Sequence, residues 1–300
     1  MTFDVVGFGA LNLDKLFKVN MIAKEEEEGS VLDFKESAGG SAANTVVGLA
    51  RLELKTGFIG KVAADREGNF LLDDFRKEGV DVKGITVSAK GRSGVAMGFI
   101  DQKGDRALYV DPGVNDQVDF KDINLDYVSG TEFLHLSSFV GEKPFKAQKN
   151  LIEQLSSVKI SFDPGAIYSR KGLAALKPII RRSYVMFPNG IEVKLLTGQD
   201  YREGARTLTE LGADLVAVKL GKRGCYVTDG KDSHLIEPYK VEAVDTTGAG
   251  DAFCAGFIYG LIRGRDLYEC GKLGNFVASR CISKMGARTG LPKLEDLKNL

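Results

Sequence analysis

One segment of the sequence combines backbone N–H groups at a helix start with a carboxylate. Residues 245–253 read DTTGAGDAF, and the apolar stretch that follows predicts a helix. The N–H groups of Gly248, Ala249 and Gly250 would lie at its first turn, where free donors and the helix dipole bind anions. A carboxylate repels an anion, so Asp251 suits another task, which is to accept the proton of a hydroxyl that attacks phosphorus. The segment therefore predicts a phosphoryl-transfer site with Asp251 as catalytic base, and the competing interpretation is an ordinary capped helix start.

Other nucleotide-binding patterns are missing from the sequence. The phosphate loop GxxxxGK[ST] and the HRD catalytic loop of protein kinases do not occur. Gly7-Phe8-Gly9 lacks the third glycine of a dinucleotide fingerprint, and polar residues follow it instead. A dehydrogenase is therefore disfavoured.

Composition narrows the class of protein further. The 300 residues include 41 Lys plus Arg and 41 Asp plus Glu, so the formal net charge is zero, whereas nucleic-acid binders usually carry a positive surplus. Four scattered cysteines and two histidines do not suggest a zinc site, and we expect free thiols. The N-terminal residues do not read as a signal peptide, and no apolar run approaches the roughly 20 residues of a membrane helix. We expect a soluble, cytoplasmic protein with neither nucleic acid nor membrane as partner.

Apolar runs typical of strands alternate with helical patterns along most of the chain. The predicted strands are 3–10, 57–62, 133–136, 158–162, 184–187, 215–220 and 224–228. The predicted helices are 41–53, 66–79, 144–156, 191–196, 204–212, 250–263 and 266–283. This alternation predicts a mainly parallel sheet covered by helices on both faces.

The segment 92–111 departs from that alternation. Apolar residues alternate on both sides of a Lys103-Gly104-Asp105 turn, which predicts a β-hairpin. A hairpin inserted in an α/β pattern indicates a small additional sheet, to which part of 13–35 could contribute. The run Glu25–Glu28 within that stretch reads as a solvated loop or edge. We expect one domain over 1–300, with a lid formed by parts of about 12–37 and 92–112.

The chain resembles the PfkB carbohydrate kinases, also called the ribokinase-like family. DTTGAGD resembles the second signature of that family, and GGSAAN, at residues 39–44, resembles the first. GALNLD, PNGIE, KLGKRG and GARTGLP also stand in the family's order, so the resemblance covers nearly the whole chain. It implies a three-layer α/β/α domain with a mainly parallel sheet and a small β-sheet lid. It also implies a carbohydrate kinase, a phosphotransferase with an alcohol group as acceptor, that uses ATP.

The resemblance implies residues for the acceptor side. Asn12 and Asp14 follow the first strand, at the edge of a parallel sheet where ligands bind, and a carboxylate accepts strong hydrogen bonds from sugar hydroxyls. The full set is Asn12, Asp14, Gly39, Gly40 and Asn44, with Met97, Phe99 and Arg106 from the lid.

For the nucleotide, the resemblance implies Asn189, Lys219, Gly221, Gly224 and Asn275. Glu192 would organise Mg²⁺ through water, as is typical of phosphoryl-transfer sites. Asp245 and Thr247, beside the GARTGLP turn, resemble the loop that binds a monovalent cation such as K⁺ in some members.

The acceptor itself stays open. We favour the hydroxymethyl group of a sugar, as in ribokinases and fructokinases, yet Ser137, Ser138 and Phe139 stand where ribokinases place an acidic residue. Phe139 and Met97 could stack on a base, which would suit a nucleoside kinase. A non-catalytic ligand-binding regulator with the same fold is the third hypothesis. Exposed strand edges in the lid, together with the resemblance, favour a homodimer joined through the lids.

Overall fold

A nine-stranded sheet forms the centre of the protein. The computed structural model describes residues 2–103 and 105–298, and only the backbone of Arg106. The strand order is β13 (Ser233–Ile236), β12 (Cys225–Thr228), β11 (Leu215–Lys219), β10 (Ser183–Met186), β9 (Lys159–Asp163), β8 (Phe133–Ser137), β1 (Val5–Phe8), β4 (Thr56–Ala63) and β5 (Ile85–Ser88). Strands β11 to β5 run parallel, whereas β12 and β13 pair antiparallel at one edge. The predicted mainly parallel sheet is confirmed, and the carboxyl ends of its parallel strands open at one edge.

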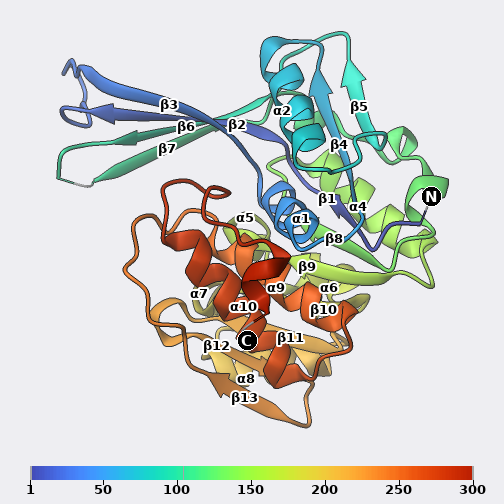
Figure 1. Ribbon diagram of the computed structural model, residues 1–300. Coiled ribbons are helices and arrows are strands. Elements are labelled where there is room, and N and C mark those ends of the chain that lie inside the picture. Colours follow the sequence, from blue (N-terminus) through green and yellow to red (C-terminus); the bar gives the residue numbers. More distant parts are fainter. Residues whose placement is uncertain (1, 104, 299–300) are drawn as a thin grey trace.

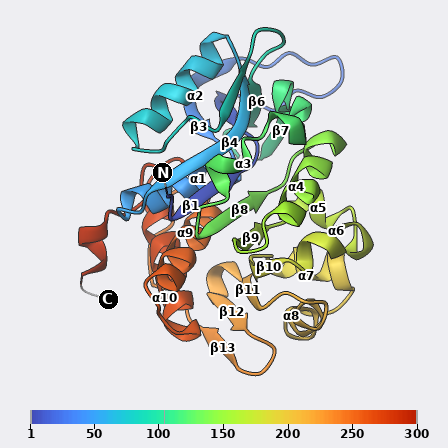
Figure 2. The same cartoon turned by 90° about the vertical axis from the view of Figure 1, so that its right-hand side faces the viewer.

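Helices cover both faces of this sheet, as Figure 2 shows. One face carries α1 (Ser41–Arg51), α2 (Arg66–Lys77), α9 (Ala249–Ile262) and α10 (Leu267–Ile282). The other face carries α4 (Glu142–Gln154), α6 (Leu173–Ile180), α7 (Gly190–Thr197) and α8 (Tyr201–Glu210). The short helices α3 (Leu125–Val128) and α5 (Gly165–Ser169) complete the set of α-helices in the described residues. None of the helices within these residues is long and apolar enough to span a membrane.

Helix α9 packs between α1 and α10. Its sequence AFCAGFIYGLI is apolar around nearly the whole circumference, which is typical of a buried helix. This packing fixes the first turn of α9, which contains Asp251, against the first turn of α1.

A second sheet of four strands projects from the body as a long arm (Figure 1). Its order is β3 (Val31–Gly39), β2 (Asn12–Val19), β6 (Gly94–Ile100) and β7 (Arg106–Asp111). The strands fall within the two ranges predicted for the lid, 12–37 and 92–112, except for the last two residues of β3. The run Glu25–Glu28 lies in the connection between β2 and β3, and Gly104 in the hairpin turn lies outside the described residues.

A buried glutamine ties together the strand ends beside the site. The side chain of Gln148, on α4, donates from Nε2 to the carbonyl oxygens of Phe8 (3.1 Å) and Ser137 (2.8 Å). Its Oε1 accepts a hydrogen bond from the Tyr168 hydroxyl at 2.9 Å. These bonds fix the carboxyl ends of β1 and β8, where the chain enters the site.

We expect Gln148→Leu to lower the free energy of unfolding by about 3 kcal/mol, because two buried carbonyls and one hydroxyl lose their partner. Urea denaturation followed by circular dichroism measures the change. Asn150→Ala, at an exposed position of the same helix, is the control and should lie within about 0.5 kcal/mol of the parent. Equal stability of the two variants would contradict this role for Gln148.

Candidate active site

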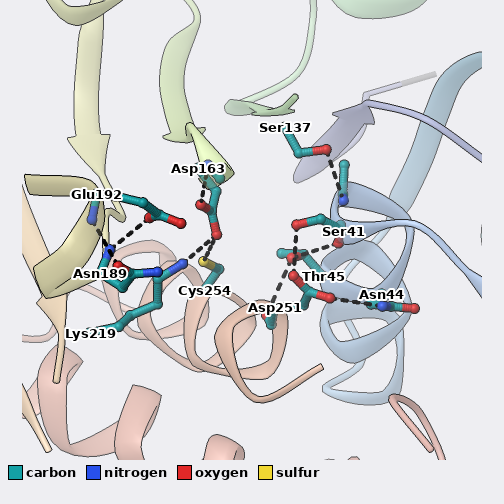
Figure 3. Close-up of polar contacts among 12 residues, drawn as sticks. Ser41, Asn44, Thr45, Ser137, Asp163, Asn189, Glu192, Lys219, Asp251 and Cys254 are labelled. Atoms are coloured by element: carbon teal, nitrogen blue, oxygen red, sulfur yellow. Dashed lines mark hydrogen bonds and ion pairs between the residues drawn. The ribbon is translucent and has the colours of Figure 1, made fainter. Parts of the chain in front are cut away.

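The polar side chains at the sheet edge form two neighbouring groups (Figure 3). The base group consists of Asp251 with its contacts Ser41, Asn44 and Thr45. The ion-pair group consists of Asp163, Lys219, Glu192 and Cys254. The first group joins the starts of α1 and α9, and the second joins the ends of β9 and β11 to α7 and α9.

Both carboxylate oxygens of Asp251 accept hydrogen bonds from α1. Ser41 Oγ donates to Oδ1 at 2.7 Å, and Asn44 Nδ2 donates to Oδ2 at 2.8 Å. Thr45 Oγ1 lies 3.2 Å from the Asp251 carbonyl oxygen, to which it donates. Burial raises the pKa of Asp251 to about 6, although the bonds from Ser41 and Asn44 act to lower it. A carboxylate with this pKa is mostly ionised at neutral pH and more basic than a solvated aspartate, as suits a general base.

The backbone at the start of α9 depends on Gly248. Gly248 adopts a left-handed conformation (φ 78°), and an added Cβ would lie 2.6 Å from the Cβ of Ala287, so a larger residue would not fit. The N–H group of Ala249 donates to the Thr246 carbonyl oxygen at 3.2 Å. The predicted set of three free donors is therefore reduced by one, because Ala249 already has an acceptor.

A buried ion pair lies beside this helix start. Lys219 Nζ pairs with Asp163 Oδ2, and a Cβ added to Gly250 would lie 3.3 Å from Nζ. Cys254 Sγ donates to Asp163 Oδ2 at 3.6 Å. Burial acts to lower the pKa of Lys219, but the negative charges of Asp163 and Glu192 outweigh it and raise this pKa. Lys219 therefore supplies a fixed positive charge close to the start of α9.

Glu192 and Asn189 form a capping box on α7. Asn189 Oδ1 accepts from the N–H groups of Ile191 and Glu192, each at 2.9 Å, and the Asn189 N–H donates to Glu192 Oε2 at 2.8 Å. Burial, and then the charge of Asp163, raises the pKa of Glu192. The helix cap uses Oε2 of Glu192, and the other carboxylate oxygen takes no part in the cap.

On the acceptor side, Asp14 lies against the glycine turn. An added Cβ at Gly39 would come within 2.2 Å of Asp14 Oδ2, so only glycine permits this approach. Asn12 Oδ1 accepts from Asn115 Nδ2 at 3.0 Å, and that amide also donates to the Leu11 carbonyl oxygen. Gly40 is the residue immediately before α1, and Asn44 contacts Asp251 directly. The structure thus brings the predicted acceptor residues of β2 and α1 to the same edge.

The strand register argues against the predicted acceptor contacts of Met97 and Phe99. Asp14 pairs with Ala96 and Lys15 pairs with Met97, and side chains alternate between faces along a strand. Ala96 and Gly98 therefore share a face with Asp14, whereas Met97 and Phe99 lie on the opposite face. The side chain of Arg106 lies outside the described residues.

The residues predicted to bind the nucleotide lie partly at the end of β11 and partly on α10. Lys219 ends β11, and Gly221 and Gly224 lie in the turn that follows it. Asn275 is buried on α10, where its Nδ2 donates to the carbonyl oxygens of Ile236 (3.1 Å) and Glu237 (3.0 Å). Its amide donors therefore hold the segment after β13, which limits a direct contact with a base to the amide oxygen.

Asp245 links the two loops predicted to hold a monovalent cation. Its Oδ1 accepts from the Thr247 N–H at 2.9 Å, and its Oδ2 accepts from the Gly286 N–H at 2.8 Å. Within the described residues, no group of three His, Cys, Asp or Glu side chains could hold a metal ion by itself. Any divalent ion here would therefore depend on water and ligand phosphates, as Mg²⁺ commonly does.

Five residues of the site or in contact with it were not predicted from the sequence: Ser41, Thr45, Asp163, Cys254 and Arg288. Asp163 is the last residue of the buried strand β9, at the carboxyl end of a parallel strand where ligands bind, and Ser41 lies inside the GGSAAN motif. Arg288 donates from Nε to Asn44 Oδ1 at 2.8 Å, although 244 residues separate the two in the chain. No local pattern indicates that contact.

The family is established by comparison with known proteins. The model of the pfkB family carbohydrate kinases matches residues 3–294. A protein of Archaeoglobus fulgidus described as an uncharacterized sugar kinase is 46% identical over 253 residues, which cover 83% of this chain and all of the relative. An ATP-dependent ribose-1-phosphate kinase of Halopiger xanaduensis is 30% identical and covers 95% of this chain, which in turn covers 94% of that protein.

A ribokinase of Thermotoga maritima superposes with a TM-score of 0.89 over 99% of this chain and 98% of its own, at 24% identity. This likeness confirms the ribokinase-like α/β fold. The chain belongs to the pfkB family of carbohydrate kinases.

Lys219→Met is expected to lower the free energy of unfolding by about 3–5 kcal/mol, because it leaves the buried Asp163 carboxylate without its counter-charge. The double variant Lys219→Met, Asp163→Leu should recover at least half of this loss, since neither charge then remains buried. Urea denaturation of the single and double variants tests the pair. Additive losses would show that the two side chains do not stabilise each other.

Proposed function

We propose that the chain is an ATP-dependent kinase that transfers the γ-phosphoryl group to the hydroxymethyl group of a sugar, with Asp251 as general base. The proposal rests above all on the placement of Asp251. Its pKa is raised by burial, its carboxylate is oriented by two donors from α1, and it stands in the first turn of α9. A carboxylate accepts up to about four hydrogen bonds, so these two donors leave room for an acceptor hydroxyl.

In this mechanism the acceptor hydroxyl donates its proton to Asp251 as its oxygen forms a bond to the γ-phosphorus. The bond between that phosphorus and the β–γ bridging oxygen breaks, and ADP leaves. The N–H groups at Gly248 and Gly250 and the dipole of α9 stabilise the charge of the transferring group, with a smaller contribution from Ala249. Lys219 adds positive charge from the side of β11.

The acceptor is held between the lid and α1. Asp14 and Asn12 of β2 would accept and donate hydrogen bonds to sugar hydroxyls, while Gly39, Gly40 and Asn44 provide the turn beneath. Ala96 and Gly98, on the same face as Asp14, would cover the sugar in place of Met97 and Phe99. The lid would exclude water, which otherwise competes as acceptor.

On the nucleotide side, Asn189, Lys219, Gly221 and Gly224 would surround the phosphates and ribose, with Asn275 near the base. The Halopiger relative is described as an ATP-dependent kinase, which supports ATP as donor. Mg²⁺ would neutralise the β- and γ-phosphates, and the carboxylate oxygen of Glu192 that is not used in the helix cap suits a metal held mainly through water.

A sugar is favoured over a nucleoside as acceptor. Phe139 is only 1% exposed and packs edge-on against Phe8, with ring centroids 5.5 Å apart. Met97 points to the other face of the lid. The two side chains suggested for stacking on a base are therefore not in position, and the name of the Halopiger relative adds a sugar phosphate to the acceptors worth testing.

A panel of acceptors tests the reaction. Purified protein with Mg²⁺ and ATP should release ADP with at least one of a set of pentoses, hexoses, ribose 1-phosphate and nucleosides, measured by a coupled spectrophotometric assay. We expect a sugar or sugar phosphate to give the highest kcat/KM. Ligand binding without ADP release for every acceptor would favour the non-catalytic regulator.

Asp251→Asn should lower kcat by about 10²–10⁴-fold, with ATP affinity retained, because the amide cannot take up the proton. In the parent, kcat/KM should rise as pH increases through about 6, since only ionised Asp251 is a base. Asp73→Asn, an exposed aspartate of α2, is the matched control and should behave as the parent. A rate of Asp251→Asn near that of the parent would refute the base assignment.

The same assay in KCl or in choline chloride tests whether Asp245 and Thr247 serve a K⁺ site.

We also propose a homodimer joined through the lids. One lid face carries an aromatic row in which Phe17 stacks on Phe34 (centroids 4.8 Å apart) and on Phe99 (5.0 Å), with Tyr109 edge-on to Phe99 (6.1 Å). Phe34 and Tyr109 are 46% and 61% exposed. A second copy of the same face would bury this row, and the lid edges favour pairing.

The pair Phe34→Glu, Tyr109→Glu should convert a dimer to a monomer in light scattering coupled to size exclusion, because it places charges on the buried row. Leu108→Glu is the control, since the neighbouring position in β7 points to the other lid face and is 55% exposed. A monomeric parent protein would contradict the proposed dimer.

A further inference from the structure

A buried arginine lies directly behind the base group. Arg288, in the loop after α10, is 9% exposed and donates from Nε to Asn44 Oδ1 at 2.8 Å. Its Nη1 pairs with Asp74 of α2, and its guanidinium lies over the Phe75 ring, 5.7 Å from the centroid. Asn44 in turn contacts Asp251, so contacts run continuously from Asp74 through Arg288 and Asn44 to the candidate base.

The chemistry of these groups permits only one orientation of the Asn44 amide. A guanidinium has donors and no acceptor, and an ionised carboxylate has acceptors and no donor. Asn44 must therefore present its oxygen to Arg288 and its nitrogen to Asp251. Without Arg288, the amide could rotate by 180° about its last bond and direct its oxygen at the carboxylate, which would repel it.

We propose that Arg288 is a positioning residue for the kinase reaction: it locks the Asn44 amide and thereby the general base Asp251. The inference rests on the proposed function and adds a residue that lies one side chain behind the candidate base. Arg288 has no hydrogen bond to Asp251: its directional effect passes through Asn44, while its charge also acts on Asp251 through space, so the decisive variant is one that keeps the charge.

Stability alone does not account for the arginine. Burial lowers the pKa of Arg288 and raises that of Asp74, which reflects the cost of removing both charges from water. Replacing such a pair by apolar side chains is often neutral for stability. Nη2 of Arg288 is buried and has no hydrogen-bond partner among the described residues, which adds to the cost. The directional bond to Asn44 is what an apolar residue could not supply.

The base responds to several groups, and the test must separate them. Ser41 and Asn44 of α1, Asp163 of β9 and Lys219 of β11 all act on the pKa of Asp251. Only Asn44 connects directly to Arg288. Loss of the Asn44 N–H bond would raise the pKa of Asp251, because that bond stabilises the ionised form.

Arg288→Lys is the central variant, since an ammonium can pair with Asp74 but does not match the planar fork that also reaches Asn44. The matched control is Arg51→Lys. Arg51 holds the same loop by donating from Nη1 to the Arg288 carbonyl oxygen at 2.6 Å, and it pairs with Glu78 and not with Asn44. Both variants are compared with the parent and with Asp251→Asn.

Two measurements are made on each protein. The first is the pH profile of kcat/KM with the best acceptor of the panel. The second is a ¹³C NMR titration of the Asp251 carboxyl carbon in the ligand-free protein, assigned with Asp251→Asn, which needs no acceptor.

For Arg288→Lys we expect kcat to fall about 10–100-fold. The acid limb of the kcat/KM profile and the midpoint of the Asp251 NMR titration should both move upward by about one pH unit. Arg51→Lys should leave both titrations in place. If Arg288→Lys does not fold, the pair Arg288→Met, Asp74→Leu removes both charges and serves in its stead. Unshifted titrations in a folded Arg288 variant would overturn the inference even if the parent is an active kinase.

No turnover by the parent with any acceptor would instead overturn the proposed function, while the NMR shift would still report on Arg288.

Discussion

The contact between the first turns of α1 and α9 is the interaction on which the site depends. Ser41 and Asp251 lie 210 residues apart, and their side chains meet at 2.7 Å only because both helices pack on the same face of the sheet. The apolar character of α9 is thus part of the site, because the buried helix holds its polar first turn in place. A shift of α9 along its axis would separate the carboxylate from both donors of α1.

Negative charge exceeds positive charge in the cluster at this sheet edge. Asp163, Glu192 and Asp251 are carboxylates within one cluster, and Lys219 is the cation among them. Their mutual repulsion, together with burial, raises the pKa of Glu192 and of Asp251, while the same carboxylates raise the pKa of Lys219. The edge is therefore suited to a ligand that brings its own compensating charges, as a nucleotide with Mg²⁺ does.

The two faces of the lid carry different side chains. Because side chains alternate along β2 and β6, Asp14 shares a face with Ala96 and Gly98, while Phe17 shares the other with Phe99. The Asp14 face also carries the exposed side chains of Leu108 and Val110, so the two faces differ in their aromatic rings and in Asp14, and not in overall polarity.

The sequence by itself determined the order of strands and helices, the parallel sheet and the motif residues Asp251, Gly248 and Asn44. The elements and the start of α9 follow from periodicity and from local rules for helix starts, which act over a few residues, whereas Asn44 was indicated by the resemblance to the family. The hairpin 92–111 was predicted for the same reason, whereas short elements such as β5 and α5 were missed because four or five residues carry little periodic signal.

Only the tertiary structure decided what those residues touch. The Asp163–Lys219 ion pair and the Arg288–Asn44 bond join distant segments, and no local pattern encodes such pairs. The face occupied by Met97 depends on register, where a shift by one residue reverses every side chain. Likewise, the availability of the Ala249 N–H depends on the turn formed by Thr246, a conformation set by the packing of the loop and not by the GAGD motif alone.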